Sequence, residues 1–390
     1  MNKLSWVIAL LYLNLLIVGC DNGKTTETVF PAQATSAACA SASIANRYVV
    51  HWENGNYSVV ETESHVDDEI FRNTYVKDNL AAIKHVDRDI RISINQISKK
   101  DLSTQSGISS WGPNKIEAPA VWSQGFQGQN VRVGIVDGMV DASHVQLRNN
   151  ILVSEQFNDE INNSQVNIHG THVAGIIAAD PSKGPVVGVA PAAKIIAGQF
   201  IGNDGGGSLG DAIIAMNYVA AQGVKVINMS WGGAPCVQNL RSALQELSSK
   251  DILIVTASGN DGLNSDYSPT YPAAFMLDSQ INVAASTSDD YMIYFSNFGF
   301  KTVNILAPGV NIFSTVPGNK STLLDGTSMA APMVTGTAAL LWSAFPNASS
   351  QQVKIAILNS VDVARPNANV SSRGRINARK ALDTLRSMLQ

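Results

Sequence analysis

From about residue 111 onward, short apolar runs alternate with longer stretches that favour helices. The apolar runs have the length of buried β-strands and lie at residues 131–136, 194–200, 224–228, 252–257 and 281–285. Helices are predicted between and after them, at about residues 208–222, 237–249, 327–345, 350–360 and 376–389. Strands that alternate with helices pair in parallel, so the pattern predicts an α/β fold with a mostly parallel sheet covered by helices on both faces.

A smaller unit with a different pattern precedes this region, over about residues 46–100. Two alternating runs, RYVVHW and YSVVET, flank a turn-forming segment and predict a pair of strands. A polar helix is predicted at 67–79 and a further strand within 81–94. We therefore expect a small α+β unit joined by a Ser/Gly-rich linker to a large domain at residues 101–390.

The N-terminus has the pattern of an export signal. Lys3 precedes an apolar stretch from Trp6 to Val18 that is too short to be assigned as a membrane-spanning helix, so residues 1–19 are predicted to be a signal peptide. The stretch ends in Val18-Gly19-Cys20, which resembles the lipobox of bacterial lipoproteins. That resemblance implies a lipid on Cys20 and a periplasmic or cell-surface protein anchored to a membrane; the alternative is an ordinary signal with an unrelated cysteine. Residues 20–45 are small and polar and are predicted to form a flexible tether.

The hydrophobic content, the net charge and the number of cysteines limit the class of protein. The chain has 390 residues, 45% of them hydrophobic, which is enough for a large core. A net charge of −4 gives no electrostatic reason to expect a nucleic-acid partner. Separately, we expect the protein to be a monomer. Three cysteines make no disulfide framework, although Cys39 and Cys236 could pair in an oxidising compartment.

Three stretches offer an acid, a histidine and a serine in that order. They are VGIVDGMVD, in which Asp137 ends a predicted strand, NIHGTHVAG, which contains His169 and His172, and DGTSMAAP, which contains Ser328. A serine hydroxyl is a weak nucleophile unless a base removes its proton, and histidine is the usual base. A buried carboxylate then orients the imidazole. The two histidines could instead suggest a metal pair, but the zinc-helix motif spaces them by four with an adjacent Glu, so no metal site is predicted.

These blocks resemble the catalytic blocks of the subtilisin-like serine proteases, the subtilases. The resemblance extends from about Trp111 to Leu382 and implies a three-layer sandwich with serine endopeptidase activity on polypeptides. It implies that Ser328 is the nucleophile, that His169 is the base oriented by Asp137, and that His172 is structural.

The resemblance also implies the residues that surround the substrate. In the block ASGN, Asn260 would donate to the oxyanion together with the backbone N–H of Ser328. Thr270 stands where compact relatives often have glycine at the base of the first pocket, which predicts a shallow pocket that disfavours large aromatic residues. Tyr271-Pro272 would be a cis-proline turn. The remaining implied substrate-binding residues are Gly205, Gly206, Gly207, Ser230, Trp231, Gly232, Ala257 and Gly259.

Some positions depart from the family pattern. Gly138-Met139 replaces the usual hydroxyl residue and glycine after the acid, so an alternative is a weak or inactive peptide-binding protein with the same fold. A different α/β hydrolase is disfavoured because the serine is not in a G-x-S-x-G turn. Residues 180–186 match the length of a calcium loop, but Gln146 replaces the expected carboxylate. We predict no required cofactor; calcium is possible but is not expected at this usual strong site.

The unit at about residues 46–97 occupies the place of the subtilase pro-domain. The resemblance implies that it assists folding and that its C-terminal tail inhibits the enzyme. Cleavage after it would leave the lipid with the pro-domain and free the protease.

Overall fold

The computed structural model describes residues 24–30, 43–94, 111–158, 167–233, 238–365 and 368–390. Cys20, Cys39, Cys236 and the predicted signal peptide lie outside the described residues. Within the described residues, no helix has the length and apolarity needed to span a membrane.

A nine-stranded sheet forms the centre of the larger domain, with the strand order β14-β15-β11-β10-β9-β8-β4-β6-β5. All neighbouring strands are parallel except β14 and β15, as the apolar runs predicted. The strands are β4 (Arg132–Asp137), β5 (Ile151–Gln156), β6 (Lys194–Gln199), β8 (Val226–Met229), β9 (Leu253–Ala257), β10 (Gln280–Ser286), β11 (Ile305–Pro308), β14 (Asp362–Val363) and β15 (Gly374–Arg375).

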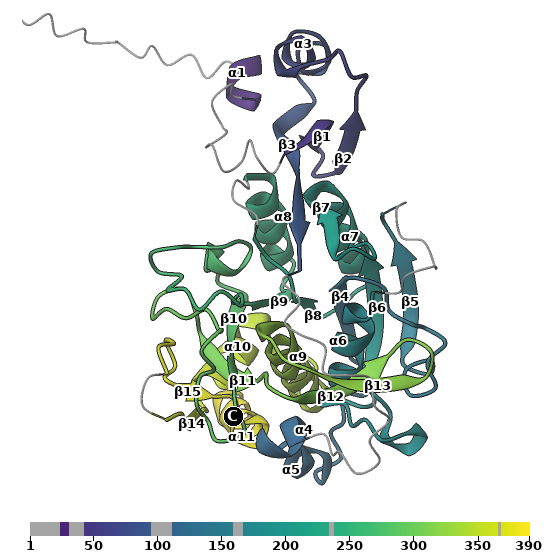
Figure 1. Ribbon diagram of the computed structural model, residues 1–390. Coiled ribbons are helices and arrows are strands. Elements are labelled where there is room, and N and C mark those ends of the chain that lie inside the picture. The colour runs from purple at the N-terminus through teal and green to yellow at the C-terminus, as the bar shows by residue number, and fades with distance from the viewer. Residues whose placement is uncertain (1–23, 31–42, 95–110, 159–166, 234–237, 366–367) are drawn as a thin grey trace, which may run out of the picture.

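Helices cover both faces of this sheet and make the fold a three-layer α/β sandwich (Figure 1). One face packs against α6 (His169–Ala178), α9 (Thr327–Ala344), α10 (Ser350–Leu358) and α11 (Ala378–Met388), with the short helices α4 (Trp111–Lys115) and α5 (Ala118–Trp122) at the edge. The other face packs against α7 (Leu209–Ala221) and α8 (Gln238–Ser249). A hairpin of β12 (Ile312–Val316) and β13 (Lys320–Leu324) packs on α6, and 3-10 turns form at Pro181–Lys183 and Ala273–Phe275.

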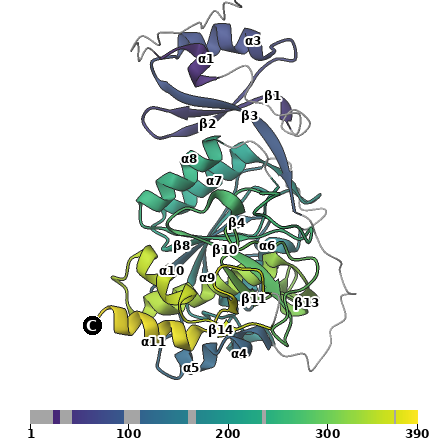
Figure 2. The same cartoon turned by 90° about the vertical axis from the view of Figure 1, so that its left-hand side faces the viewer.

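The N-terminal unit is built on a second sheet, with the strand order β2-β1-β3-β7. Its own strands are β1 (Ser43–Trp52), β2 (Tyr57–Glu61) and β3 (Ile83–Ser93), and its helices are α1 (Thr26–Val29) and α3 (Asp68–Phe71), the latter followed by a π-helical turn at Arg72–Val76. The fourth strand, β7 (Gly206–Ser208), belongs to the larger domain. Figure 2 shows α7 and α8 between this sheet and the large one.

Successive side chains of β1 point to opposite faces of the small sheet, and apolar residues lie on both faces. Tyr48 and Val50 pack with Phe71 on the side of α1 and α3, whereas Val49 joins the apolar cluster under α7 and α8. One face of the small sheet therefore joins the core of the larger domain, and the other face has a core of its own.

The predicted tether is too long. Thr26–Val29 forms one helical turn, and Val29 and Phe30 are only 2% and 4% exposed because they pack against Tyr48 and Phe71. Val29 and Phe30 are two adjacent apolar residues in a polar stretch, and this pair could have predicted the contact. The small, polar residues around them led to the prediction of a tether instead.

Candidate functional site

The carboxyl ends of neighbouring strands bring the predicted site residues to one edge of the large sheet. Asp137 ends β4, Ser230–Gly232 follow β8, and Ala257–Asn260 end and follow β9. Parallel strands that are adjacent place their carboxyl ends together, which is where α/β proteins assemble their sites.

The structure joins Asp137 and His169 by a hydrogen bond. His169 is the first residue of α6, and its Nδ1 lies 2.7 Å from Asp137 Oδ1; Asp137 is fully buried and His169 is 4% exposed. Gly170 allows this approach, because a Cβ at that position would lie 2.3 Å from the carbonyl oxygen of Gly138. With Nδ1 held by a carboxylate, Nε2 is the ring atom available for proton transfer.

The Asp137 carboxylate has few partners. Oδ1 also accepts from the backbone N–H of Gly138 at 2.6 Å, whereas Oδ2 has no hydrogen-bond partner among the described residues. A side chain at position 138 would press on Asn167, which lies 3.2 to 3.4 Å from the place of its Cβ. Asn167 in turn accepts from His169 N–H at 2.8 Å. Because position 138 is glycine, it has no hydroxyl to donate to Asp137, and Oδ2 of Asp137 has no hydrogen-bond partner among the described residues.

Ser328 lies in the first turn of α9 and exchanges hydrogen bonds with Ser230. Pro332, four residues later, has no N–H to donate to the Ser328 carbonyl, and Ser230 Oγ donates to that carbonyl instead at 2.9 Å. Ser328 Oγ donates back to the Ser230 carbonyl at 3.0 Å. Asn228 Nδ2 donates to Ser230 Oγ at 2.9 Å. Ser230 thus fixes the position of Ser328, a role that the sequence did not indicate.

In this arrangement Ser328 does not bond to His169. His169 Nε2 has no hydrogen-bond partner within the described part of the chain, and Ser328 Oγ is turned toward Ser230. Hydrogen bonds between catalytic groups are often absent or long in unliganded sites.

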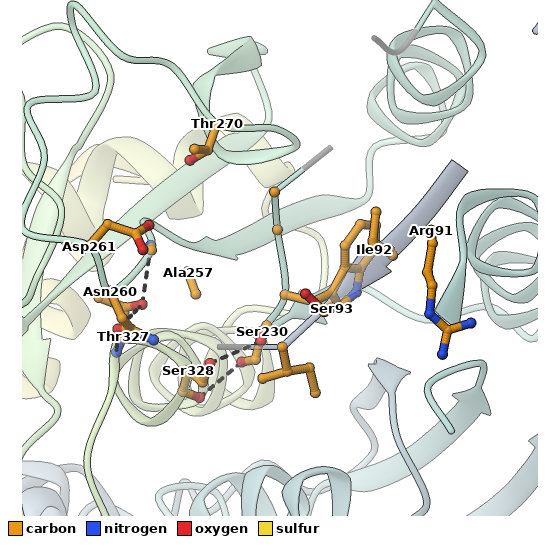
Figure 3. A pocket seen from close by; sticks show the side chains of 15 residues that line it. Arg91, Ile92, Ser93, Ser230, Ala257, Asn260, Asp261, Thr270, Thr327 and Ser328 are labelled. Carbon is orange, nitrogen blue, oxygen red and sulfur yellow. Dashed lines mark hydrogen bonds between the residues drawn. The ribbon is translucent and has the colours of Figure 1, made fainter. Parts of the chain in front are cut away.

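The side chain of Asn260 is oriented by the residue that precedes Ser328. Asn260 Oδ1 accepts from the backbone N–H and from Oγ1 of Thr327, both at 2.9 Å. These bonds place the amide oxygen on the Thr327 side and fix the orientation of the amide nitrogen. Ser328, Asn260 and Thr327 line one cavity (Figure 3).

That cavity, about 130 Å³ in volume, contains most of the predicted substrate-binding residues. Ser230, Trp231, Gly232, Ala257, Gly259 and Thr270 all line it. Asp261, Gly233 and Thr327 also line it and were not predicted, although Asp261 directly follows the predicted block ASGN. Trp231 is 3% exposed and its Nε1 donates to the Val136 carbonyl at 2.8 Å, which ties the cavity wall to β4. The peptide bond between Tyr271 and Pro272 is cis, as predicted.

The predicted glycines at 205–207 lie beside this cavity and pair with the protein's own chain. β3 runs antiparallel to β7, with Ser93 opposite Gly206 and Ile92 opposite Gly207. On its other side Ser93 forms a bridge to Gly232, and Ile94 N–H donates to the Gly205 carbonyl at 2.8 Å. Arg91 to Ile94 therefore line the same cavity as Ser328 (Figure 3).

Sequence comparisons agree with this geometry. The model of the subtilase family matches residues 128–378, more than half of the chain. The major intracellular serine protease of Bacillus subtilis (strain 168) is 38% identical over 243 residues, which is 60% of this chain and 74% of that protein. Thermitase of Thermoactinomyces vulgaris is 36% identical over 274 residues, which is 70% of this chain and 95% of thermitase.

The chain belongs to the subtilase family. It is a serine-type endopeptidase, and its substrates are polypeptides.

The second histidine of this subtilase is separate from Asp137. His172 is fully buried, its Nε2 lies 3.2 Å from the Thr322 carbonyl oxygen, and burial lowers its pKa to about 3. The two histidines face different partners, and no cluster of metal-binding side chains occurs among the described residues.

The side chain of Gln146 occupies the polar groups around residues 180–186. Gln146 Nε2 donates to the carbonyls of Asp180 and Val186 at 3.0 and 2.7 Å, and its Oε1 accepts from the Val186 N–H at 3.2 Å. Gln146 is 3% exposed. Two of the loop's carbonyl groups thus point at an N–H donor, whereas calcium would need those oxygens for itself.

The N-terminal unit contacts the subtilase domain through two carboxylates at helix N-termini, one fully buried and one partly buried. Asp89 is fully buried and accepts from the Gly210 N–H at 2.9 Å and from Ser208 Oγ at 2.8 Å, at the start of α7. Asp87 accepts from the Asn239 N–H at 2.8 Å, at the start of α8. Carboxylates at helix N-termini complement the unpaired N–H groups and the helix dipole.

An ion pair reinforces this contact. Arg47 Nη2 donates to Asp211 Oδ1 at 2.6 Å, and Arg47 Nε lies 3.3 Å from Asp89 Oδ2. Burial raises the pKa of Asp211 to about 6 and also raises that of Asp89, although Arg47 opposes both shifts. The contact between the two units therefore includes partly desolvated carboxylates as well as apolar packing.

Proposed function

We propose that this subtilase cleaves peptide bonds with Ser328 as the nucleophile and His169 as the general base. Ser328 Oγ leaves the Ser230 carbonyl, donates its proton to His169 Nε2 and attacks the substrate carbonyl carbon. The imidazolium is stabilised by Asp137 through Nδ1 and later gives its proton to the leaving amine. The 2.7 Å contact between His169 and Asp137 supports these roles.

Asn260 is proposed to stabilise the oxyanion. Its Oδ1 accepts two hydrogen bonds from Thr327, which fixes the orientation of the whole amide group, and the backbone N–H of Ser328 supplies the other donor. Donors that are fixed before the reaction stabilise the developing negative charge without reorganising. Thr270, which lines the same cavity, is proposed to limit the first pocket to residues smaller than Phe or Tyr.

The N-terminal unit is proposed to be an inhibitory pro-domain. The observation that carries this is β3, which lies as a strand between β7 and Gly232 and would exclude any substrate from the same place. The chain next to the site is then its first substrate, and cleavage between β3 and α4 would release the protease domain.

We propose that the protein is exported and anchored through a lipid on Cys20. The sequence Val18-Gly19-Cys20 after an apolar stretch supports this. Labelling cells with a radioactive fatty acid should mark the wild-type chain and not Cys20→Ser. If self-cleavage occurs, the label should stay with the N-terminal fragment.

No cofactor is proposed, and the loop at 180–186 should be stable without calcium because Gln146 holds it. In wild-type protein, the melting temperature should change by less than about 1 °C between calcium and a chelator. Gln146→Asp replaces the donating amide by a carboxylate among carbonyl groups, which repel it unless a cation binds. Its melting temperature should therefore rise with calcium; a calcium-dependent wild type would contradict the proposal.

The activity itself is tested with casein. The full chain should hydrolyse casein and lose that activity with a serine-reactive inhibitor. Ser328→Ala should lower turnover by about 10⁶-fold, whereas the exposed Ser288→Ala should not. Equal hydrolysis by wild type and Ser328→Ala would overturn the proposed function.

A further inference from the structure

The docked strand β3 places one charged side chain in the cleft. Ile92 and Ile94 alternate into the protein, where they are 4% and 9% exposed, and Arg91 and Ser93 lie on the opposite, exposed face. Arg91 pairs with Ser208 in the strand register and lines the cavity (Figure 3). Any peptide can form the backbone bonds of this strand, so only a side chain such as that of Arg91 can carry charge selectivity.

The carboxylate that meets Arg91 is held in place before any peptide binds. Arg91 Nη2 donates to Asp204 Oδ2. The other oxygen, Oδ1, accepts from the Gly206 N–H at 2.9 Å. The loop is closed by the Gly202 N–H, which donates to the Gly206 carbonyl at 2.7 Å. Asp204 is therefore fixed by the backbone of the loop as well as by the arginine.

Gly206 lets the guanidinium lie directly against the backbone. A Cβ at Gly206 would be 2.6 Å from Arg91 Nη2 and 2.9 Å from both Cζ and Nε. A planar guanidinium group can stack against the backbone and donate to the carboxylate at the same time. The compact ammonium group of lysine has no planar face to place against the backbone.

We propose that Asp204 and Gly206 form a subsite that selects arginine in the substrate, two residues before the residue that pairs with Gly232. The proposal rests on the protein acting as an endopeptidase at Ser328. In this proposal β3 occupies the cleft as a substrate strand would. Arg91 then stands at the position of the substrate residue whose side chain contacts the loop at 202–206.

The expected preference is modest because the pair is open to solvent. The side chains of Arg91 and Asp204 are 48% and 63% exposed. Exposed ion pairs contribute little, so we expect about a fivefold preference for arginine over glutamine. It should act mainly through KM, since the contact is far from the reacting bond, and it should shrink in high salt.

The test uses the full chain after it has completed self-processing. Three internally quenched peptides carry the sequence of residues 89–100, with Arg, Gln or Glu at position 91, and their cleavage products are identified by mass. Wild type should show kcat/KM highest for Arg and lowest for Glu. Asp204→Asn should bring the Arg-to-Gln ratio to about 1, and Asp204→Lys should favour Glu. The exposed Asp289→Asn, which removes the same charge elsewhere, should keep the wild-type ratio.

A second measurement is internal to the chain. The Arg91→Glu variant should process itself more slowly, and adding Asp204→Lys should restore part of the rate, which a general loss of stability would not do. Equal kcat/KM for the Arg and Gln peptides, or a ratio unchanged in Asp204→Asn, would overturn the subsite while casein hydrolysis continued. Loss of casein hydrolysis in wild type as well would instead overturn the proposed function on which the subsite rests.

Discussion

Asp137 and Asp89 are both fully buried carboxylates that accept backbone N–H groups, yet their surroundings differ. Asp89 uses both oxygens, with Ser208 and Gly210 at the start of a helix. Asp137 concentrates its contacts on one oxygen, shared between Gly138 and His169, and Oδ2 has no partner in the described chain. The first arrangement holds two units together, and the second holds one imidazole in one orientation.

The comparison is tested most strongly by removing the charge of Asp137. Asp137→Asn keeps the size of the side chain and should lower kcat by about 10⁴-fold, because His169 loses the partner that fixes its tautomer. The melting temperature of the same variant should stay within a few degrees of wild type. An active Asp137→Asn protein would show that this carboxylate does not orient the base.

The next largest effect is expected at the oxyanion donor. Asn260→Ala should lower kcat by about 10² to 10³-fold with little change in KM, because its amide acts on charge that exists only in the transition state. Steady-state kinetics on one peptide separates the two constants. A change confined to KM would assign Asn260 to substrate binding instead.

Sequence reasoning found Asp137 and could not find the role of Asp89. Asp137 ends an apolar strand, and its partner His169 lies in a block that resembles the catalytic blocks of the subtilases. Asp89 occupies a polar position of a predicted strand, and its partners Ser208 and Gly210 lie about 120 residues later, so their contact depends on how two units dock. Likewise, the glycines at 205–207 were predicted to bind the substrate chain, and in the structure they pair with β3 and Ile94 of the same protein. Ser230 Oγ donates to the Ser328 carbonyl, which receives no N–H from Pro332. This bond could not be predicted either, because it joins residues that only the tertiary fold brings together.

Asp89→Ala should loosen the docked N-terminal unit without altering the groups at Ser328. The Gly210 N–H and the Ser208 hydroxyl then lose the carboxylate that accepts their hydrogen bonds. The free energy of docking between the two units should weaken by about 1 to 3 kcal/mol. In the Ser328→Ala background, hydrogen exchange at Ile94 and at the paired strand β7 should become faster. The exposed Asp78→Ala is the matched control. Unchanged exchange in Asp89→Ala would mean that apolar packing alone holds the unit.

The smallest expected effect concerns pH and His172. Burial lowers its pKa in the native protein to about 3, below its ordinary value near 6.5. Between those values the unfolded chain binds more protons than the native one, so the free energy of unfolding falls as pH falls from 6.5 toward 3. Thermal unfolding of Ser328→Ala protein should show this loss, and His172→Gln should reduce it. An equal slope against pH in both proteins would assign the acid sensitivity to other groups.

The central claim is that this chain is an endopeptidase whose own strand occupies the cleft beside Ser328. It is tested most directly by the fate of the purified full chain, followed by intact mass and N-terminal sequencing. Wild type should separate into an N-terminal fragment and a protease domain, with the cut between Ile94 and Trp111, while Ser328→Ala remains whole. The claim would be contradicted if both chains stayed whole, or if both were cut at the same bond.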